Sequence, residues 1–280
     1  MNIKGNVHLL KHDFYIPMSN EKRIHRFVNS IIILGNEITL IDTGTKDSYQ
    51  TIFNYIKERG RSINEIKLLI LSHSHPDHVG SAHKIKSLTN CKVIAHRAEK
   101  EWIEDLDCQY QSRKVPGFYQ LVNEAVKVDD FVEHNQEIML DKNLTIQVIH
   151  SPGHSKGSIN LLFKEDKILF SADSIPLVND IPNYDNFKQL QESLEAIKCC
   201  KDYEILLSSW TEPIADVASI QKLIMEGEEY LGNLDKVVKI HYASQQENTL
   251  GNCKQVVDSL GLPPFYVNPI VHIAFQSHFK

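Results

Sequence analysis

The stretch Ser72–Gly80, "SHSHPDHVG", places three histidines and one aspartate within six residues, from His73 to His78. It follows the apolar run "EIKLLIL", which predicts a buried strand. Residues two apart at the end of a strand point to the same side, so His73 and His75 can bind one metal ion. Pro76 turns the chain, which allows Asp77 and His78 to face a second ion. Imidazole nitrogens and carboxylate oxygens suit zinc, and manganese and iron accept the same donor types.

The composition is that of an ordinary soluble protein. The chain has 280 residues, of which 42% are hydrophobic and 24% are charged. A net charge of −6 gives no electrostatic footprint for nucleic acid or for an anionic membrane. No apolar stretch is long enough to span a membrane, and charged residues interrupt the N-terminal stretch where a signal peptide would need an apolar core. The five cysteines form no Cys-x-x-Cys pair, which favours reduced thiols. We therefore expect a cytoplasmic protein that binds neither nucleic acid nor membranes.

Strands and helices alternate along the chain. Apolar runs predict strands at 30–35, 37–42, 65–73, 91–96 and 204–210, and four more strands between 137 and 173. Amphipathic patterns predict helices at 48–60, 81–90 and 185–200, and further helices within 97–133 and from 214 to about 244. This alternation favours an α/β arrangement, with strands packed in sheets and helices outside them.

Three further stretches carry candidate functional residues. They are "LIDTG" (Leu40 to Gly44), "SPGHSKGS" (Ser151 to Ser158) and "ILFSADS" (Ile168 to Ser174). Taken alone, His154 would be part of a plain Gly-His turn, and Asp173 would be a turn or helix cap. In this order after His-x-His-x-Asp-His, however, the motifs resemble the metallo-β-lactamase superfamily of metal-dependent hydrolases, in its glyoxalase II-like and general hydrolase branch. The resemblance covers roughly residues 20–213.

The resemblance implies a four-layer αββα sandwich, of the α/β (α+β) class, with the metal site at one edge of the sheets. It implies a metallo-β-lactamase-like domain over 1–213, with a helical insert or lid at 97–133, and a helical C-terminal extension over 214–280 that packs on the same domain. His73, His75 and His154 would hold one zinc ion, and Asp77, His78 and the bridging Asp173 a second. Asp42 would brace the metal loops from behind. A hydroxide held by the ions would attack the substrate, and Asp77 would orient it and handle its proton.

The sequence departs from this family at one position. The second metal site usually gains one more histidine in a turn before a Glu-Pro pair, but "ILLSSWTEPI" (Ile205 to Ile214) has Trp210 there. Three alternatives follow. Water or substrate could occupy the vacant position, which would leave a weaker second site. The protein could instead work with one tightly bound ion, or a histidine further along the chain could serve as the missing ligand. Among His241, His272 and His278 the last is preferred, because the aromatic-flanked tail could pack back on the domain. The alternative is that the tail only packs and that these histidines bind no metal. The position of Trp210 favours a pocket wall over core packing.

The leading hypothesis is a hydrolase that attacks an ester-like bond, in a thioester, a lactone or a phosphodiester, of a small-molecule substrate. The alternatives are a di-iron redox protein and a non-catalytic metal-binding sensor on the same fold. Specificity is expected in the segment 97–133, in the N-terminal loop "FYIPMSNEKRIHRF" and in the C-terminal helices. Pocket candidates, each equally consistent with ordinary packing, are Phe14, Tyr15, Trp102, Phe118 and Tyr119. A homodimer is the base-rate expectation for the oligomeric state.

Overall fold

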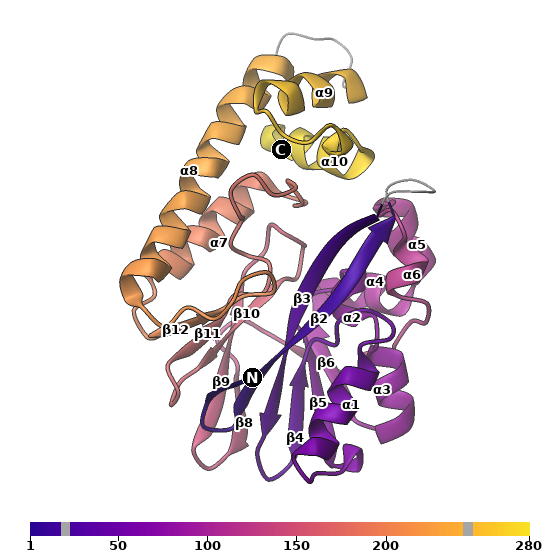
Figure 1. Ribbon diagram of the computed structural model, residues 1–280. Coiled ribbons are helices and arrows are strands. Elements are labelled where there is room, and N and C mark those ends of the chain that lie inside the picture. The colour runs from indigo at the N-terminus through magenta and orange to yellow at the C-terminus, as the bar shows by residue number, and fades with distance from the viewer. Residues whose placement is uncertain (18–22, 243–248) are drawn as a thin grey trace.

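Two β-sheets packed face to face, with helices on both outer surfaces, form the core of the chain (Figure 1). The computed structural model describes residues 1–17, 23–242 and 249–280. The predicted αββα sandwich is therefore confirmed. Among the described helices, none has the length and apolar character that crossing a membrane requires.

The first sheet has seven strands in the order β1-β2-β3-β4-β5-β6-β7. In chain order they are β1 (Asn2–Lys4), β2 (Val7–Pro17), β3 (Arg23–Leu34), β4 (Ile38–Ile41), β5 (Ile66–Leu71), β6 (Lys92–His96) and β7 (Asp130–Val132). The strands β1 to β4 pair antiparallel, whereas β4 to β7 run parallel.

The second sheet has five strands in the order β12-β11-β10-β9-β8. They are β8 (Glu137–Asp141), β9 (Leu144–His150), β10 (Ile159–Phe163), β11 (Ile168–Phe170) and β12 (Ile205–Leu207). The pairs β8–β9, β9–β10 and β10–β11 are antiparallel, and β11 and β12 are parallel.

Helices cover both outer faces. Those on the side of the first sheet are α1 (Tyr49–Glu58), α2 (Pro76–Val79), α3 (Ala82–Thr89), α4 (Lys100–Glu104), α5 (Leu106–Ser112) and α6 (Phe118–Leu121). The later helices are α7 (Phe187–Cys199), α8 (Val217–Tyr242), α9 (Leu250–Ser259) and α10 (Pro269–Gln276). Short 3-10 turns are η1 (Ile63–Glu65), η2 (Arg97–Glu99), η3 (Pro264–Tyr266) and η4 (Ser277–Phe279).

The continuous apolar runs of the strands arise because each sheet is buried on both faces. On β3, Ile31 and Ile33 face the core between the sheets, whereas Ile32 faces the helices of the first sheet. The same alternation places Ile70 of β5 in the core between the sheets and Leu69 under the helices. Most apolar side chains in these runs are thus removed from water, which stabilises the fold by roughly 25 cal/mol per Å² of apolar surface.

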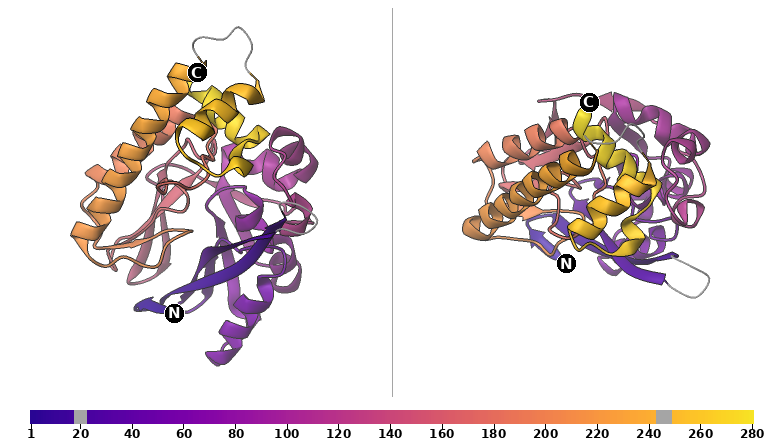
Figure 2. Two further views of the ribbon diagram at one scale, coloured as in Figure 1. Left: turned by 45° about the horizontal axis from the view of Figure 1, so that its top comes forward. Right: turned by 90° about the horizontal axis from the view of Figure 1, so that it is seen from above.

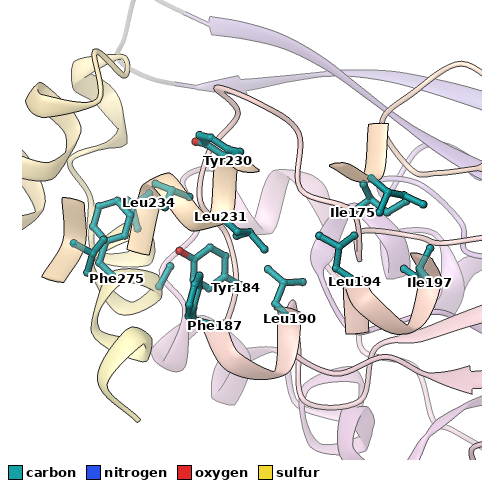
Figure 3. Packing of buried hydrophobic residues seen from close by; sticks show 14 of the residues in the cluster. Ile175, Tyr184, Phe187, Leu190, Leu194, Ile197, Tyr230, Leu231, Leu234 and Phe275 are labelled. Atoms are coloured by element: carbon teal, nitrogen blue, oxygen red, sulfur yellow. The ribbon is translucent and has the colours of Figure 1, made fainter. Parts of the chain in front are cut away.

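The outer face of the second sheet packs against α7, α8 and the C-terminal helices. Figure 3 shows Leu190, Leu194 and Ile197 of α7 in this packing, with Leu231 and Leu234 of α8 nearby. Phe275 of α10 joins the same cluster. Figure 2 shows α9 and α10 lying over one end of the sandwich. The C-terminal extension therefore shares one hydrophobic core with the second sheet.

Two segments differ from the simplest interpretation of the sequence. The stretch from Phe14 to Phe27, expected as a loop, consists of the paired ends of β2 and β3, apart from 18–22, which lie outside the described residues. The segment 97–133 contributes α4, α5, α6 and β7, and Ile103, Phe118 and Val122 pack in the helical layer of the first sheet.

The ligand-bearing loops all follow carboxyl ends of strands at one edge of the sandwich. The Asp42 loop follows β4 and the Ser72–His78 loop follows its parallel neighbour β5. In the second sheet, β9, β11 and β12 run in one direction, and the loops after them start at Ser151, Ser171 and Ser208. Such an edge is where ligands bind in α/β proteins.

Within β2 the alternation of apolar residues is interrupted by a buried histidine. His12 is 3% exposed, and its Nε2 lies 2.7 Å from Ser30 Oγ on β3. Burial lowers the pKa of His12 to about 4, from an ordinary value of 6.5, against a small opposing effect of Asp13. The folded chain therefore binds this proton less readily than the unfolded chain does.

We expect His12 to make the fold acid-sensitive. Because the unfolded chain protonates His12 first, its contribution to stability is complete above about pH 6.5 and is lost as the pH falls toward 4. Between pH 7 and pH 5 this amounts to about 2 kcal/mol. Urea unfolding with EDTA present should show that His12→Asn loses less stability over this range than the unmodified chain, while His25→Asn, at an exposed position on β3, behaves like the unmodified chain. Equal losses in all three proteins would contradict the assignment.

Candidate metal site

The site contains side chains from both sheets. His73 and His75 lie in the loop between β5 and α2, and Asp77 and His78 lie in the first turns of α2. His154 comes from the turn between β9 and β10, and Asp173 from the loop after β11. The structure thus brings all six residues of the predicted ligand set to one edge.

The first group consists of His73, His75, His154 and Asp173. One ligand atom from each of these residues lies within 4.8 Å of those of the others. His154 Nε2 is 2.8 Å from His75 Nδ1 and 3.3 Å from Asp173 Oδ2, and His73 Nε2 is 4.0 Å from the same carboxylate oxygen. These atoms converge on one point, as the donors of a single cation do.

Asp77 and His78 extend this group on one side. His78 Nε2 lies 3.2 Å from Asp173 Oδ1 and 3.9 Å from Asp77 Oδ2. Asp173 therefore stands between the two groups, with one oxygen toward His154 and the other toward His78. This is the placement that the sequence resemblance implied for a bridging carboxylate.

Asp42 holds the loop from behind. Its Oδ2 accepts hydrogen bonds from His78 Nδ1 at 2.9 Å and from Ser72 Oγ at 2.6 Å, and its Oδ1 accepts one from Ser72 N at 2.7 Å. The side chain is fully buried. Because Asp42 accepts the hydrogen bond from Nδ1, the ring of His78 is held with Nε2 toward the site.

A second buried carboxylate, Glu99, was missed by the sequence analysis. Glu99 Oε2 accepts from Ser74 N at 2.9 Å and from Ser74 Oγ, and Oε1 accepts from Ser155 Oγ at 2.7 Å and from Gly157 N. One side chain in the turn before α4 thus ties the loop of His73 and His75 to the loop of His154. No short sequence motif indicates a contact between residues so far apart in the chain. The sequence around Glu99 is rich in charged residues, which is typical of an exposed segment.

Several ring nitrogens of the cluster are buried without a hydrogen-bond partner. They include Nε2 of His73, His75 and His78. The carboxylate atom Asp173 Oδ1 also makes no hydrogen bond, although it lies 3.2 Å from His78 Nε2. An unsatisfied buried polar group costs about 1–3 kcal/mol, so a group of them needs a partner of another kind. Coordination to a cation supplies that partner, and the mixed nitrogen and oxygen donors fit zinc. The residues present therefore fit a metal centre.

The electrostatics favour neutral imidazoles on one side of the cluster. Burial lowers the pKa of His154 to about 4 and, with neighbouring positive groups, holds the pKa values of His73 and His75 well below the ordinary range. For His78 burial acts in the same direction, but Asp173 and Asp42 outweigh it and raise the pKa. Metal ligation requires neutral imidazole, which the first three rings supply.

Trp210 stands in the wall of the site. Its ring lies 6.4 Å from the ring of His78, centroid to centroid, and the guanidinium of Arg26 lies 4.6 Å from its centroid. Arg26 in turn donates two hydrogen bonds of 2.8 Å to the carboxylate of Asp180. Burial opposes the charge of Arg26, but Asp180 outweighs it and raises the pKa. An aromatic and ionic wall thus occupies the side on which a further histidine was expected.

The downstream histidines lie elsewhere. His278, the preferred extra ligand, accepts or donates at Nε2 with Tyr184 Oη at 2.7 Å and at Nδ1 with Asp235 Oδ1 at 3.0 Å, and its ring stacks on Phe187. It is no member of the metal-ligand group found among the described residues. His241 contacts Ser259 and His272 contacts Tyr242, both in the C-terminal helices. The hypothesis that the tail only packs fits these contacts, because packing of α10 against α7 and α8 directs His278 into the helical layer.

A pocket of about 190 Å³ opens beside His75 and Asp77. Of the predicted pocket residues, Phe14 lines it, whereas Tyr15 is exposed and Phe118 is buried in the helical layer. Trp102 lies in a small separate hollow near Glu101, and Tyr119 is exposed and bonded to Asp107. A smaller hollow of about 70 Å³ lies beside His154 and Asp173, and Trp210 borders both spaces.

Comparison with known proteins places these features in a family. The chain is 27% identical over 147 residues to a probable metallo-hydrolase of Methanocaldococcus jannaschii, which covers 52% of this chain and 66% of the relative. It is 28% identical over 109 residues to a hydroxyacylglutathione hydrolase of Haemophilus influenzae, covering 39% of this chain and 49% of the relative. The chain thus spans about half to two thirds of the length of these curated relatives.

Solved structures show the same fold. A metallo-beta-lactamase family protein of Thermus thermophilus matches with a TM-score of 0.73 at 17% identity, covering 98% of this chain and 93% of that chain. A subclass B3 metallo-beta-lactamase of Bradyrhizobium japonicum matches with a TM-score of 0.61 at 21% identity, covering 78% and 89%. The family model of the metallo-beta-lactamase superfamily matches residues 23–208. Because this match covers more than half of the chain, the chain belongs to the metallo-beta-lactamase superfamily.

Proposed function

We propose that the chain is a metal-dependent hydrolase that cleaves an ester-like bond, in a thioester, lactone or phosphodiester, of a small-molecule substrate. The observation that carries this proposal is the buried convergence of unpartnered imidazole nitrogens and carboxylate oxygens beside an open pocket. Relatives named as metallo-hydrolases and as a hydroxyacylglutathione hydrolase support it.

In this proposal His73, His75 and His154 hold the first zinc ion, and Asp77, His78 and Asp173 hold the second. A bound divalent ion would lower the pKa of its bound water to about 7, and it would polarise the oxygen of the bond that is attacked. Asp77 is the residue that orients the nucleophile and accepts its proton. Its side chain borders the pocket, and burial raises its pKa, which suits a carboxylate that exchanges a proton.

The second ion is the weaker of the two. Trp210 supplies no ligand at neutral pH, and the described histidines of the C-terminal helices are bonded within their own layer. The positive charge of Arg26, which stacks on Trp210, also acts on Asp77. Both effects lower the affinity of this side of the site for a cation.

His75→Ala should abolish hydrolysis and lower bound metal, because His75 borders both the cluster and the pocket. Turnover is measured on p-nitrophenyl esters, bis-p-nitrophenyl phosphate, thioesters and lactones, and metal content by mass spectrometry of the purified protein. His83→Ala, in α3, is the matched control and should retain both. Unchanged turnover in His75→Ala would refute the proposed hydrolase site.

Asp42→Asn should weaken metal binding about 10- to 100-fold, the usual effect of removing an outer partner of a ligand histidine. The new amide cannot both accept from His78 Nδ1 and accept the two bonds from Ser72. Competition with a chromogenic chelator measures the affinity. Asp47→Asn, at an exposed position in the same loop, should leave it unchanged; equal affinities in the two variants would show that Asp42 does not tune the site.

Trp210→His should raise the metal content from about one toward two ions per chain. The comparison is made at a low free zinc concentration, at which only a tight site fills. The reason is that the new imidazole restores a nitrogen donor beside His78. Trp210→Phe, which also removes the indole but adds no ligand, is the control for the loss of the wall. His278→Ala should leave the metal content unchanged, since His278 is bonded to Tyr184 and Asp235. A fall in metal content in His278→Ala would contradict its assignment to the helical layer.

A further inference from the structure

The walls of the larger pocket are mostly apolar. Phe14 and Ile16 come from β2, Ile24 from β3, and Val115 and Leu121 from the segment around α6. Phe265 and Ile270, from the C-terminal extension, face the same space. Three segments that are distant in sequence therefore build one apolar wall, and Asp77 and His75 of the metal cluster line the same pocket.

The charged groups in this wall are already paired. Apart from His75 and Asp77 of the metal cluster, the charged residues that line the pocket in the described part of the chain are Arg26 and Arg113. Arg26 binds both oxygens of Asp180, and Arg113 donates to Asp185 and to Asn183. Each guanidinium already faces a carboxylate, and only Nε of Arg113 is buried without a hydrogen-bond partner. An ionised group entering the pocket would therefore lose hydration and gain little compensating charge from this wall.

Part of this wall lies outside the part of the chain that matches the family model. The family model covers residues 23–208, whereas Phe14, Ile16, Trp210, Phe265 and Ile270 lie before or after that range. The β2–β3 hairpin and the C-terminal extension therefore add apolar side chains to those that the matched range contributes.

We propose that this pocket binds an uncharged, apolar acyl chain, so that the substrate is an ester or thioester of an acyl group with several methylenes. The proposal rests on the proposed hydrolase function, because the acyl carbon must reach the metal cluster, whose His75 and Asp77 line the pocket. The smaller hollow beside His154 and Asp173 then accommodates the group on the other side of the scissile bond.

The test is a series of straight-chain p-nitrophenyl esters, from acetate to decanoate, with the zinc-loaded full chain. We expect kcat/KM to rise about fourfold for each added methylene until the pocket is full, the factor that corresponds to about 0.8 kcal/mol per buried methylene. A terminal carboxylate should reverse this gain: the mono-p-nitrophenyl ester of suberic acid should react at least tenfold more slowly than the octanoate. A flat series, or an acid-terminated ester that reacts as fast as the octanoate, would overturn the proposal while leaving the hydrolase function intact.

Filling the pocket gives a second test. Ile24→Trp places an indole in the wall at a half-buried position of β3 and should shift the optimum to shorter chains. His25→Trp, the next residue, adds the same bulk on the opposite face of the strand and should leave the optimum unchanged. An identical chain-length profile in both variants would place the acyl chain elsewhere.

Binding separates the two proposals if no ester is cleaved. If the thioesters, lactones and phosphodiesters are not cleaved either, the hydrolase function fails. In both cases the pocket is tested by titrating the chain with straight-chain alkan-1-ols, from ethanol to decan-1-ol, while Trp210 emission is recorded in a Trp102→Phe background. Affinity that rises about fourfold per methylene supports the apolar pocket. No change of Trp210 emission with any of the alcohols would overturn it.

Discussion

Two buried carboxylates that point away from the proposed ions hold the metal site together. Asp42 joins β4 to the loop after β5 and fixes the ring of His78. Glu99 joins that same loop to the turn of His154, which belongs to the other sheet. The six proposed ligands come from separate loops of both sheets, so their convergence depends on bonds of this kind rather than on local geometry. Loss of either carboxylate would leave several buried donors without acceptors, so we expect a neutral side chain at either position to destabilise these loops.

The ligand set could be predicted because its signals are local. His73 and His75 are two apart at a strand end, and His154 and Asp173 follow recognisable turns, so each motif is visible within a few residues. Glu99 carries no such signal, because its four donors lie about 25 and 56–58 residues away along the chain. The β2–β3 hairpin was missed for a related reason. The buried His12 and the exposed Lys11 and Asp13 disguise an alternation that continues from Leu10 to Phe14. Apolar runs in the sequence indicate the fully apolar strands. They do not indicate a strand in which a neutral histidine takes one of the buried positions.

Trp210 illustrates how one substitution changes the role of a whole wall. A histidine there would be an additional donor to the second ion. The indole instead packs against Phe14 and His78 and offers its face to Arg26, which Asp180 holds in place. Tyr230 and Tyr266 contact Asp180 from the later helices and so tie the wall to the C-terminal extension. Trp210 therefore contacts Arg26 and Phe14 where a histidine would contact the metal, and through Arg26 and Asp180 it connects the site to the C-terminal extension.

The tryptophan at position 210 also affects the charge that a substrate would meet in the proposed site. In the proposed site, a weakly bound second ion adds little positive charge beside the pocket, and both guanidiniums of the wall already face carboxylates. A highly charged phosphodiester would meet little compensation in such a space, whereas a neutral carbonyl needs only one strong cation to polarise it. The same wall that replaces the closing ligand thus also favours an uncharged acyl substrate over an anionic one. Restoring a histidine at Trp210 should therefore move both properties together, giving a tighter second ion and a greater relative rate on phosphodiesters.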